Sequence, residues 1–322
     1  MPRSNARGAM FSLAAFAVYS THDLVVKLLG TEFAPFQIVF FSVLFGFPVV
    51  SVMLMRDPTD GNLIPRYPLW TAVRTTAQVI STVCVFYAFS ALPLAQTYAI
   101  LFAQPLLITL LAIPILREPV GLHRGLAVLV GLGGVMVVLQ PGSTELELGH
   151  AAALIGAFGG ATASIVVRKV GREERNAVLM LYPMVANFLV MGAALAFIYE
   201  PVEIQHIGGF ALMSFLSICA LLLQFAAYRN AAAGVVAPMQ YSQIIWATLF
   251  GALIFGERPG LNTAIGAGIV IGSGVYIVMR ETRKYGTTAP VLSTRARFAQ
   301  GTLPRFGSFA RIWRNNASQK DS

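Results

Sequence analysis

Ten apolar runs of about 20 residues, joined by short polar connections, constrain this chain more than any other feature. A helix of that length spans the roughly 30 Å hydrocarbon core of a bilayer and satisfies its own backbone hydrogen bonds there. Only 11% of the 322 residues are charged, against about 25% in soluble domains, and 56% are hydrophobic. The sequence therefore predicts an all-α integral membrane protein. We expect its spans at residues 8–29, 33–55, 68–90, 94–116, 123–140, 149–169, 177–198, 208–228, 234–255 and 262–280.

The basic residues gather at alternate connections between these runs. With the N-terminus in the cytoplasm, all 23 lysines and arginines except Lys27 and Arg258 lie on the cytoplasmic side. This distribution follows the positive-inside rule, so the net charge of +9 indicates membrane orientation and argues against a nucleic-acid partner. We predict a multi-pass protein of the cytoplasmic (inner) membrane of a bacterium, with both termini in the cytoplasm.

The chain contains an internal repeat. The stretch from Pro93 to Gly121 returns 139 positions later as Ala232 to Gly260. Residues 25–27 likewise resemble residues 166–168, at a shift of 141. The chain is therefore built from two copies of one unit. The shift of 139 pairs Gln104 with Gln243, Thr109 with Thr248, and Glu118 with Glu257.

Each copy, at residues 1–140 and 148–280, holds five spans. Because five is odd, the second copy enters the membrane the opposite way up, as in the inverted-topology repeats of many secondary transporters. The alternative is a duplication kept only for symmetric packing, but alternating access gives the inversion a physical reason. We expect ten transmembrane helices in two inverted five-helix repeats, followed by a basic cytoplasmic tail at residues 281–322.

Over residues 8–280 the chain resembles the EamA-type transporters of the drug/metabolite transporter superfamily. The resemblance rests on the two five-span halves and on the motifs that end the fourth span of each, Glu118-Pro119 and Glu257-Arg258-Pro259. HDLVVKLLG at 22–30 and FQIVFF at 36–41 are similar to a subgroup of S-adenosylmethionine and riboflavin uptake proteins. That subgroup often has arginine where Ser42 stands here. The resemblance implies ten helices around a central cavity and rigid-body rocking of the two halves.

One acidic residue, Asp23, lies well inside a span. Charged groups within a bilayer are unfavourable and usually face a cavity or the protein interior. Asp23 is therefore our first candidate to bind a cationic or proton-donating group of a substrate, and His22 is a candidate titrating neighbour. The alternative is that Asp23 pairs with Lys27, four residues further along the same helix face.

The third, fourth, eighth and ninth spans carry the other candidates for substrate binding. An amide side chain within a span can equally bond to another helix, so each glutamine has a structural alternative. Tyrosine and tryptophan rings can stack on an aromatic or cationic solute, but most aromatic residues in membranes only pack. The candidates are Tyr98, Gln104, Gln240, Tyr241, Gln243 and Trp246, with Gln78 and Gln224 ranked lower.

Glu118 and Glu257 end the two equivalent spans. A carboxylate near a helix C-terminus is unfavourable with the helix dipole, so each needs a specific partner, and we interpret both as gate or structural residues. Small residues four positions apart let helices approach closely. Gly268 and Gly272 therefore predict either packing between neighbouring spans or a homodimer contact.

The sequence contains no enzyme signature that we recognise. It has no HExxH, no GxSxG and no phosphate-binding loop, and its few histidines, cysteines and acidic residues are scattered. We therefore expect neither a cofactor nor a metal. Without a nucleotide-binding motif, energy would come from an ion gradient, with a proton as the candidate coupling ion, or from exchange. The sequence predicts a secondary active transporter of a small organic metabolite; a membrane-embedded enzyme and a passive channel are the alternatives.

Overall fold

The computed structural model describes residues 5–55, 63–117, 121–141, 147–171, 173–231 and 233–285. All secondary-structure elements of these residues are helices, as the apolar runs predict. Glu118 and residues 286–322 of the predicted tail lie outside this part of the chain. The helices of the first repeat are α1 (Asn5–Leu29), α2 (Pro35–Met55), α3 (Pro68–Ala91), α4 (Leu94–Leu101), α5 (Gln104–Leu116) and α6 (Leu122–Leu139). Those of the second are α7 (Leu148–Val170), α8 (Asn176–Ile198), α9 (Ile204–Asn230), α10 (Ala233–Val236), the 3-10 helix η1 (Ala237–Ser242), α11 (Gln243–Ile254) and α12 (Leu261–Tyr285).

The helices are consistent with ten membrane spans. Eight stretches are long and apolar enough to cross a bilayer, and α4 with α5 together form one of them. The apolar part of α2, Pro35–Pro48, is shorter, and the ninth predicted span is divided among α10, η1 and α11. With these two segments, the helices account for all ten predicted spans.

The fourth and ninth spans are broken, although the sequence predicted each as a single run. In the first repeat the break precedes Pro105, which has no N–H to donate and whose ring clashes with the preceding turn of a helix. In the second repeat Pro238 lies in the 3-10 segment that joins α10 to α11. Gln104 and Gln243, which the repeat pairs, are the first residues of α5 and α11. The two breaks are therefore equivalent positions of the repeat.

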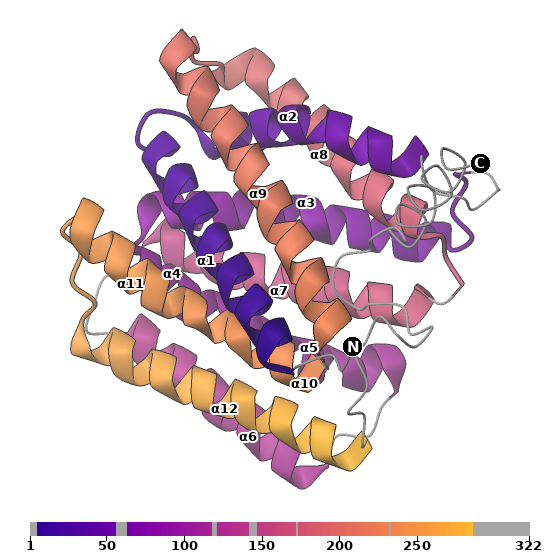
Figure 1. Ribbon diagram of the computed structural model, residues 1–322, viewed down its shortest axis with the longest axis vertical. Coiled ribbons are helices and arrows are strands. Elements are labelled where there is room, and N and C mark those ends of the chain that lie inside the picture. Colours follow the sequence, from indigo (N-terminus) through magenta and orange to yellow (C-terminus); the bar gives the residue numbers. More distant parts are fainter. Residues whose placement is uncertain are drawn as a thin grey trace, which may run out of the picture.

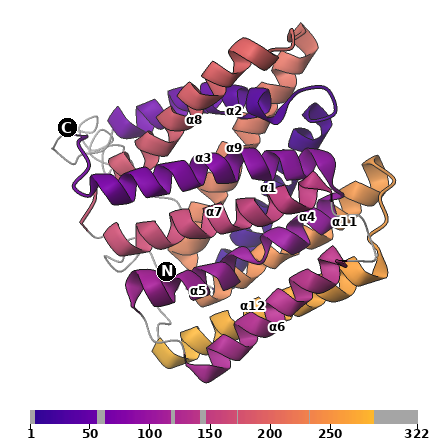
Figure 2. The same cartoon turned by 180° about the vertical axis from the view of Figure 1, so that it is seen from behind.

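The two repeats are interleaved in space. α1 packs on α9 and on the broken span α10–η1–α11 of the second repeat, while α7 packs on α3, α4 and α5 of the first. In Figure 1, α1, α9, α11 and α12 cross the near side; Figure 2 shows α3, α7 and α6 from the opposite side. Among the other contacts between the repeats, α2 with α8 and α6 with α12 pair equivalent helices. The first helix of each repeat is thus exchanged into the other, which no sequence feature indicated.

Glycines set the close approach of α6 and α12, which lie side by side in both views (Figures 1 and 2). A Cβ added at Gly266 would lie 2.5 Å from Cγ2 of Val138 and 2.6 Å from the carbonyl oxygen of Gly134. A Cβ added at Gly268 or Gly272 would meet no atom within 4 Å. The prediction that Gly268 and Gly272 pack helices within the chain is therefore wrong, because the close contact lies at Gly134 and Gly266. A homodimer contact through Gly268 and Gly272 stays a prediction.

Gly256 ends α11 and positions the residue that follows it. Its φ of +66° lies in the left-handed region, which glycine adopts without a steric penalty. The N–H of Glu257 then donates to the carbonyl oxygen of Gly251 at 2.9 Å. The Glu257 side chain folds back over α11, where a Cβ on Gly251 would lie 2.8 Å from Glu257 Oε2.

Replacing Gly266 with alanine is expected to lower the thermal stability of the protein, because α6 and α12 must separate to admit the methyl group. Such overpacking costs about 1–3 kcal/mol. Gly268→Ala is the matched control, with the same gain in helix propensity on the same helix and no atom within 4 Å of the new Cβ. The midpoint of thermal unfolding in detergent measures both variants. Equal midpoints would contradict a close-packed contact between α6 and α12.

Candidate functional site

Asp23 is largely buried, near the C-terminal end of α1, between helices of both repeats. Its side chain is 15% exposed, and that of His22 is 11% exposed. Nδ1 of His22 lies 2.7 Å from Oδ1 of Asp23, and the His22 ring meets Phe86 of α3 edge-on. The hydroxyl of Tyr98, on α4, donates a hydrogen bond to Oδ2 of Asp23. The carboxylate is thus held by an imidazole and a phenol.

Tyr98 connects Asp23 to the second repeat. Its ring packs on Phe89 and Phe102, with centroid distances of 5.3 and 5.9 Å. Its hydroxyl accepts a hydrogen bond from Nε2 of Gln243 at 3.3 Å. The group Asp23–Tyr98–Gln243 therefore crosses between the repeats at the residue where α11 begins. Broken helices between inverted repeats form the substrate sites of many transporters, so this group has the placement expected of a binding site.

Gln104 starts α5 at the equivalent break but has different surroundings. Its amide lies against α7, where a Cβ added at Gly160 would lie 3.0 Å from Nε2 of Gln104. The shift of 139 pairs Tyr98 with Ala237, and the shift of 141 pairs Asp23 with Ser164. Ser164 donates to a carbonyl of its own helix at 2.8 Å. The chain therefore breaks at both positions, but the carboxylate and phenol occur at only one.

Lys27 pairs with Glu257 of the second repeat and not with Asp23, which removes the alternative of an ion pair along α1. Nζ of Lys27 lies 2.6 Å from Oε1 of Glu257 and donates to the carbonyl oxygen of Leu92 at 2.6 Å. Oε2 of Glu257 accepts the backbone N–H of Leu94 at 3.0 Å. The two charged side chains are 9% and 19% exposed. Glu257 thus has the specific partner that its place at a helix end requires.

Each charge of this pair also meets a helix end of the opposite sign. Lys27 binds the carbonyl that follows α3, where the helix dipole favours a cation, and Glu257 binds the first N–H of α4, where it favours an anion. Pro93 precedes α4 and offers no side-chain cap, so Glu257 supplies one from the other repeat. The residues alone did not predict Lys27 as the partner of Glu257, although a lysine within an apolar run was a signal that it needs one.

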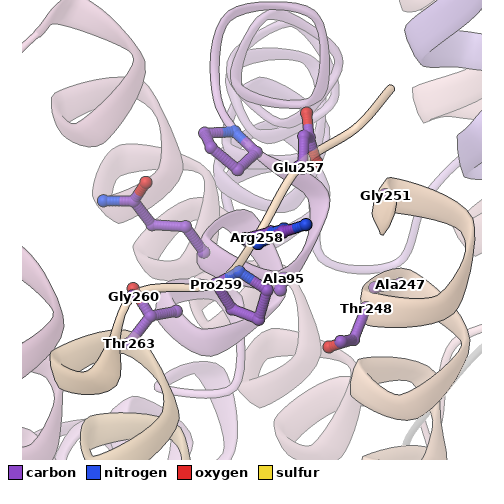
Figure 3. Close-up of a pocket in the computed structure, with 11 residues that line it drawn as sticks. Ala95, Ala247, Thr248, Gly251, Glu257, Arg258, Pro259, Gly260 and Thr263 are labelled. Atoms are coloured by element: carbon purple, nitrogen blue, oxygen red, sulfur yellow. The ribbon is translucent and has the colours of Figure 1, made fainter. Parts of the chain in front are cut away.

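A pocket of 130 Å³ lies beside this ion pair, at the face that the charge pattern predicts to be external. Its lining includes Ala95 and Gln96 of α4, Thr248 of α11, Thr263 of α12, and Glu257. Figure 3 shows Thr248 and Thr263 on opposite sides of the pocket. Because the lining comes from both repeats, a movement of α4 relative to α11 would change the shape of the pocket.

Three further candidates lie on the broken ninth span. Tyr241 is buried in η1; its ring meets Phe102 edge-on at 5.0 Å and its hydroxyl packs against Gly274. Gln240 is half-buried on the same 3-10 helix, and Trp246 is half-buried on α11. Within the described part of the chain, the structure shows no hydrogen bond from these three residues to Asp23. They border the centre of the site without completing it.

The lower-ranked glutamines differ in what they contact. Gln78 donates to Oγ1 of Thr82 at 3.4 Å, one turn further along α3. Gln224 on α9 has a carbonyl oxygen that is buried without a hydrogen-bond partner among the described residues. Gln78 thus bonds within its own helix, and both glutamines stay predicted candidates for substrate binding.

Two further contacts, which were not predicted from the sequence, link the repeats at opposite faces. Oε2 of Glu32 lies 2.8 Å from Nε2 of His206 at the predicted external face. At the other face the hydroxyl of Tyr67 donates to Glu173, and this hydrogen bond raises the pKa of Tyr67. The repeat shifts carry Glu32 onto Glu173 and Tyr67 onto His206, so the contacts are equivalent. The repeat was the signal that could have found them.

The chemistry that this site offers is binding and proton exchange. A carboxylate, an imidazole, a phenol and an amide meet around Asp23, and such groups can bind a cation or exchange a proton. Among the described residues, no group of three or more His, Cys, Asp or Glu side chains is placed to hold a metal ion.

The sequence matches the EamA-like transporter family twice, over residues 6–140 and 147–280. An S-adenosylmethionine uptake transporter of Rickettsia prowazekii (strain Madrid E) is 23% identical over 277 residues, covering 86% of this chain and 94% of that protein. A riboflavin transporter of Vibrio cholerae serotype O1 is 27% identical over 264 residues, covering 76% of this chain and 87% of that protein. One crystal structure, described only as that of a protein, shares the fold with a TM-score of 0.57 and 18% identity. The match covers 88% of this chain and 100% of the other.

Replacing Glu257 with glutamine is expected to destabilise the protein, because Lys27 is left as a buried charge without a carboxylate. Breaking a buried ion pair in this way costs about 3–5 kcal/mol. The double variant Lys27→Met/Glu257→Gln is expected to recover most of that loss, since neither charge remains. Thermal unfolding in detergent measures both, with Glu200→Gln as an exposed control that stays near wild type. A double variant as unstable as the single one would contradict the pairing.

Proposed function

The chain belongs to the EamA-like transporter family, and we propose that it moves a small organic metabolite across the cytoplasmic membrane by alternating access. It is a multi-pass membrane transporter: the family, relatives named as transporters and the apolar helices agree on this. The same comparisons support transport and not catalysis. The observation that carries our proposal is the hydrogen-bonded group Asp23–Tyr98–Gln243, buried between the repeats where α11 begins.

In this proposal Asp23 receives a cationic or proton-donating group of the substrate. A buried carboxylate requires partners, and the imidazole of His22 and the phenol of Tyr98 are partners that a ligand can replace. S-adenosylmethionine carries a sulfonium cation, whereas riboflavin is uncharged, so the names of the relatives share only the class of small organic metabolites. Both compounds are therefore suitable first probes.

The energy source in this proposal is an ion gradient or exchange, with a proton as the candidate coupling ion. The support is the contact of 2.7 Å between His22 and Asp23, because imidazole and carboxylate are the two kinds of side chain that carry protons in many proton-coupled proteins. The location in the inner membrane of a bacterium, with both termini cytoplasmic, rests on the charge pattern and on the bacterial relatives.

The moving units in this proposal combine helices of both repeats. Residues 1–140 and 148–280 remain the repeats, and residues 281–322 the cytoplasmic tail. However, α1 packs with α9 and α11, and α7 packs with α3 and α5. If residues 1–140 and 148–280 moved as two rigid bodies, these contacts between them would be lost. Glu257 is the gate residue at the predicted external face. The gate role of Glu118 rests on the repeat alone.

In proteoliposomes, Asp23→Asn is expected to lower uptake about tenfold or more, because charge-assisted contacts to the carboxylate are lost. Uptake is measured with radiolabelled S-adenosylmethionine and riboflavin, and a metabolite screen by ligand-induced thermal shift extends the set of compounds. Glu200→Gln is the control, since the Glu200 side chain is exposed and its contacts with Gln37 are made by its backbone. Unchanged uptake by Asp23→Asn would remove Asp23 from the site. Uptake that neither saturates nor shows counterflow would identify a passive channel.

The inverted topology predicts that Gly121 and Gly260, equivalent positions of the two repeats, lie on opposite sides of the membrane. A Cβ added at either position meets no atom within 4 Å, so cysteines there leave the packing intact. With Cys84 and Cys219 replaced by serine, we expect Gly260→Cys to react with a membrane-impermeant maleimide in intact cells. Gly121→Cys is expected to react only after permeabilisation. Reaction of both from the same side would contradict the inversion.

A further inference from the structure

Two polar contacts, one helical turn apart, join α1 to α4. Asp23 and Lys27 are four residues apart on one face of α1, and Leu94 and Tyr98 are four residues apart on α4. Tyr98 donates to Asp23, while Lys27 is linked to Leu94 through the carboxylate of Glu257. The contact at Asp23 and the ion pair of Lys27 with Glu257 are thus successive links between the same two helices.

α4 is a short segment that these links hold in place together with its packing on α7, α11 and α12. It has eight residues, is separated from α3 by Leu92 and Pro93, and is separated from α5 by a turn. Neither end continues into a neighbouring helix. The second repeat contacts it through three polar links. Glu257 accepts the N–H of Leu94, Gln243 donates to the hydroxyl of Tyr98, and Nε2 of Gln96 lies 2.9 Å from Nε2 of His150 on α7. A change at Tyr98 is therefore transmitted to Leu94 by a single rigid turn of helix.

We propose that Tyr98 is a positioning residue that couples the occupancy of Asp23 to the ion pair of Lys27 with Glu257. A cationic group that binds Asp23 displaces the Tyr98 hydroxyl. α4 then shifts, Leu94 withdraws from Glu257, and the ion pair opens toward the predicted external face. This inference rests on the proposed function, because it describes how the same site controls access to itself.

The charges at the ion pair have partners that allow it to open. When Leu94 withdraws, Glu257 loses one of its two charge-assisted contacts, so its carboxylate is held less firmly. Lys27 keeps the carbonyl oxygen of Leu92 at 2.6 Å, so its charge retains an acceptor after Glu257 leaves. The opened state therefore avoids the full penalty of an uncompensated buried charge.

The pocket beside the ion pair gives this movement a measurable consequence. Ala95 and Gln96 of α4 line it. Thr248 of α11 lines it as well, and Figure 3 labels Ala95 and Thr248. Thr248 is half-buried, and cysteine is close to threonine in size. A shift of α4 relative to α11 therefore changes how readily a thiol at position 248 reacts with a polar maleimide.

The test uses the purified full-length chain in nanodiscs, carrying Thr248→Cys with Cys84 and Cys219 replaced by serine. Asp23→Asn mimics a neutralised carboxylate, and Tyr98→Phe removes the hydroxyl while keeping the ring. Each is expected to raise the maleimide labelling rate about tenfold, the factor that the loss of one charge-assisted hydrogen bond gives. An unchanged labelling rate in Tyr98→Phe would overturn the proposal.

Ser81→Ala is the matched control for the loss of a buried hydroxyl. It removes a hydrogen bond of 2.7 Å from α3 to the carbonyl oxygen of Gly156 on α7, away from α4, and the labelling rate is expected to stay at the parent value. A rise as large as that of Tyr98→Phe would show general loosening and overturn the coupling. Thermal unfolding confirms that each variant is folded. If Asp23→Asn does not fold, Tyr98→Phe alone tests the proposal.

A double-mutant cycle separates coupling from a merely structural role. Glu257→Gln weakens the ion pair directly and sets the upper labelling rate. If Tyr98 acts through Glu257, the variant Tyr98→Phe/Glu257→Gln labels no faster than Glu257→Gln alone. Independent contacts would instead multiply the two effects, and that result would overturn the proposal. Because labelling does not depend on transport, failure here is distinguishable from failure of the uptake assays that test the proposed function.

Discussion

A bilayer offers no water to backbone N–H and C=O groups, and this constraint decides where the chain can depart from a regular helix. The breaks in the fourth and ninth spans leave such groups without helical partners. Both breaks are enclosed by protein: Phe102 and Ala103 are 6% and 1% exposed, and Tyr241 is 5% exposed. Neighbouring helices thus replace lipid around the breaks, and Gln104 and Gln243 can lie there. The burial that permits the breaks also provides the place for a polar solute.

The buried charges are arranged around the same interleaving of helices. Because α1 is exchanged into the second repeat, Lys27 lies between Glu257 and the corner where α3 meets α4. One ion pair therefore ties α1, that corner and the connection from α11 to α12. A buried ion pair is weak evidence for stability, but breaking it leaves charges that need other partners.

The scaffold is symmetric, but the site is not. Both repeats break at the same position, yet only the first supplies a carboxylate and a phenol, at Asp23 and Tyr98. The second has Ser164 and Ala237 at the equivalent positions. A symmetric scaffold allows two similar arrangements that open to opposite faces, as inverted repeats do in other transporters. In the transport mechanism that we propose, the asymmetric site presents one set of polar groups to a solute in either arrangement.

The helical class, the number of spans and the inverted repeat follow from the residues alone, because apolar run length and the 139-residue shift are properties of the linear chain. Asp23 was chosen as a candidate binding residue in the same way, since a charged side chain within an apolar run has few explanations. The partners required the spatial arrangement. Lys27 pairs with Glu257 and not with Asp23, and Gly266, not Gly268, makes the close helix contact. In a membrane the lipid-facing and protein-facing sides of a helix are both apolar, so periodicity does not reveal which side meets which neighbour.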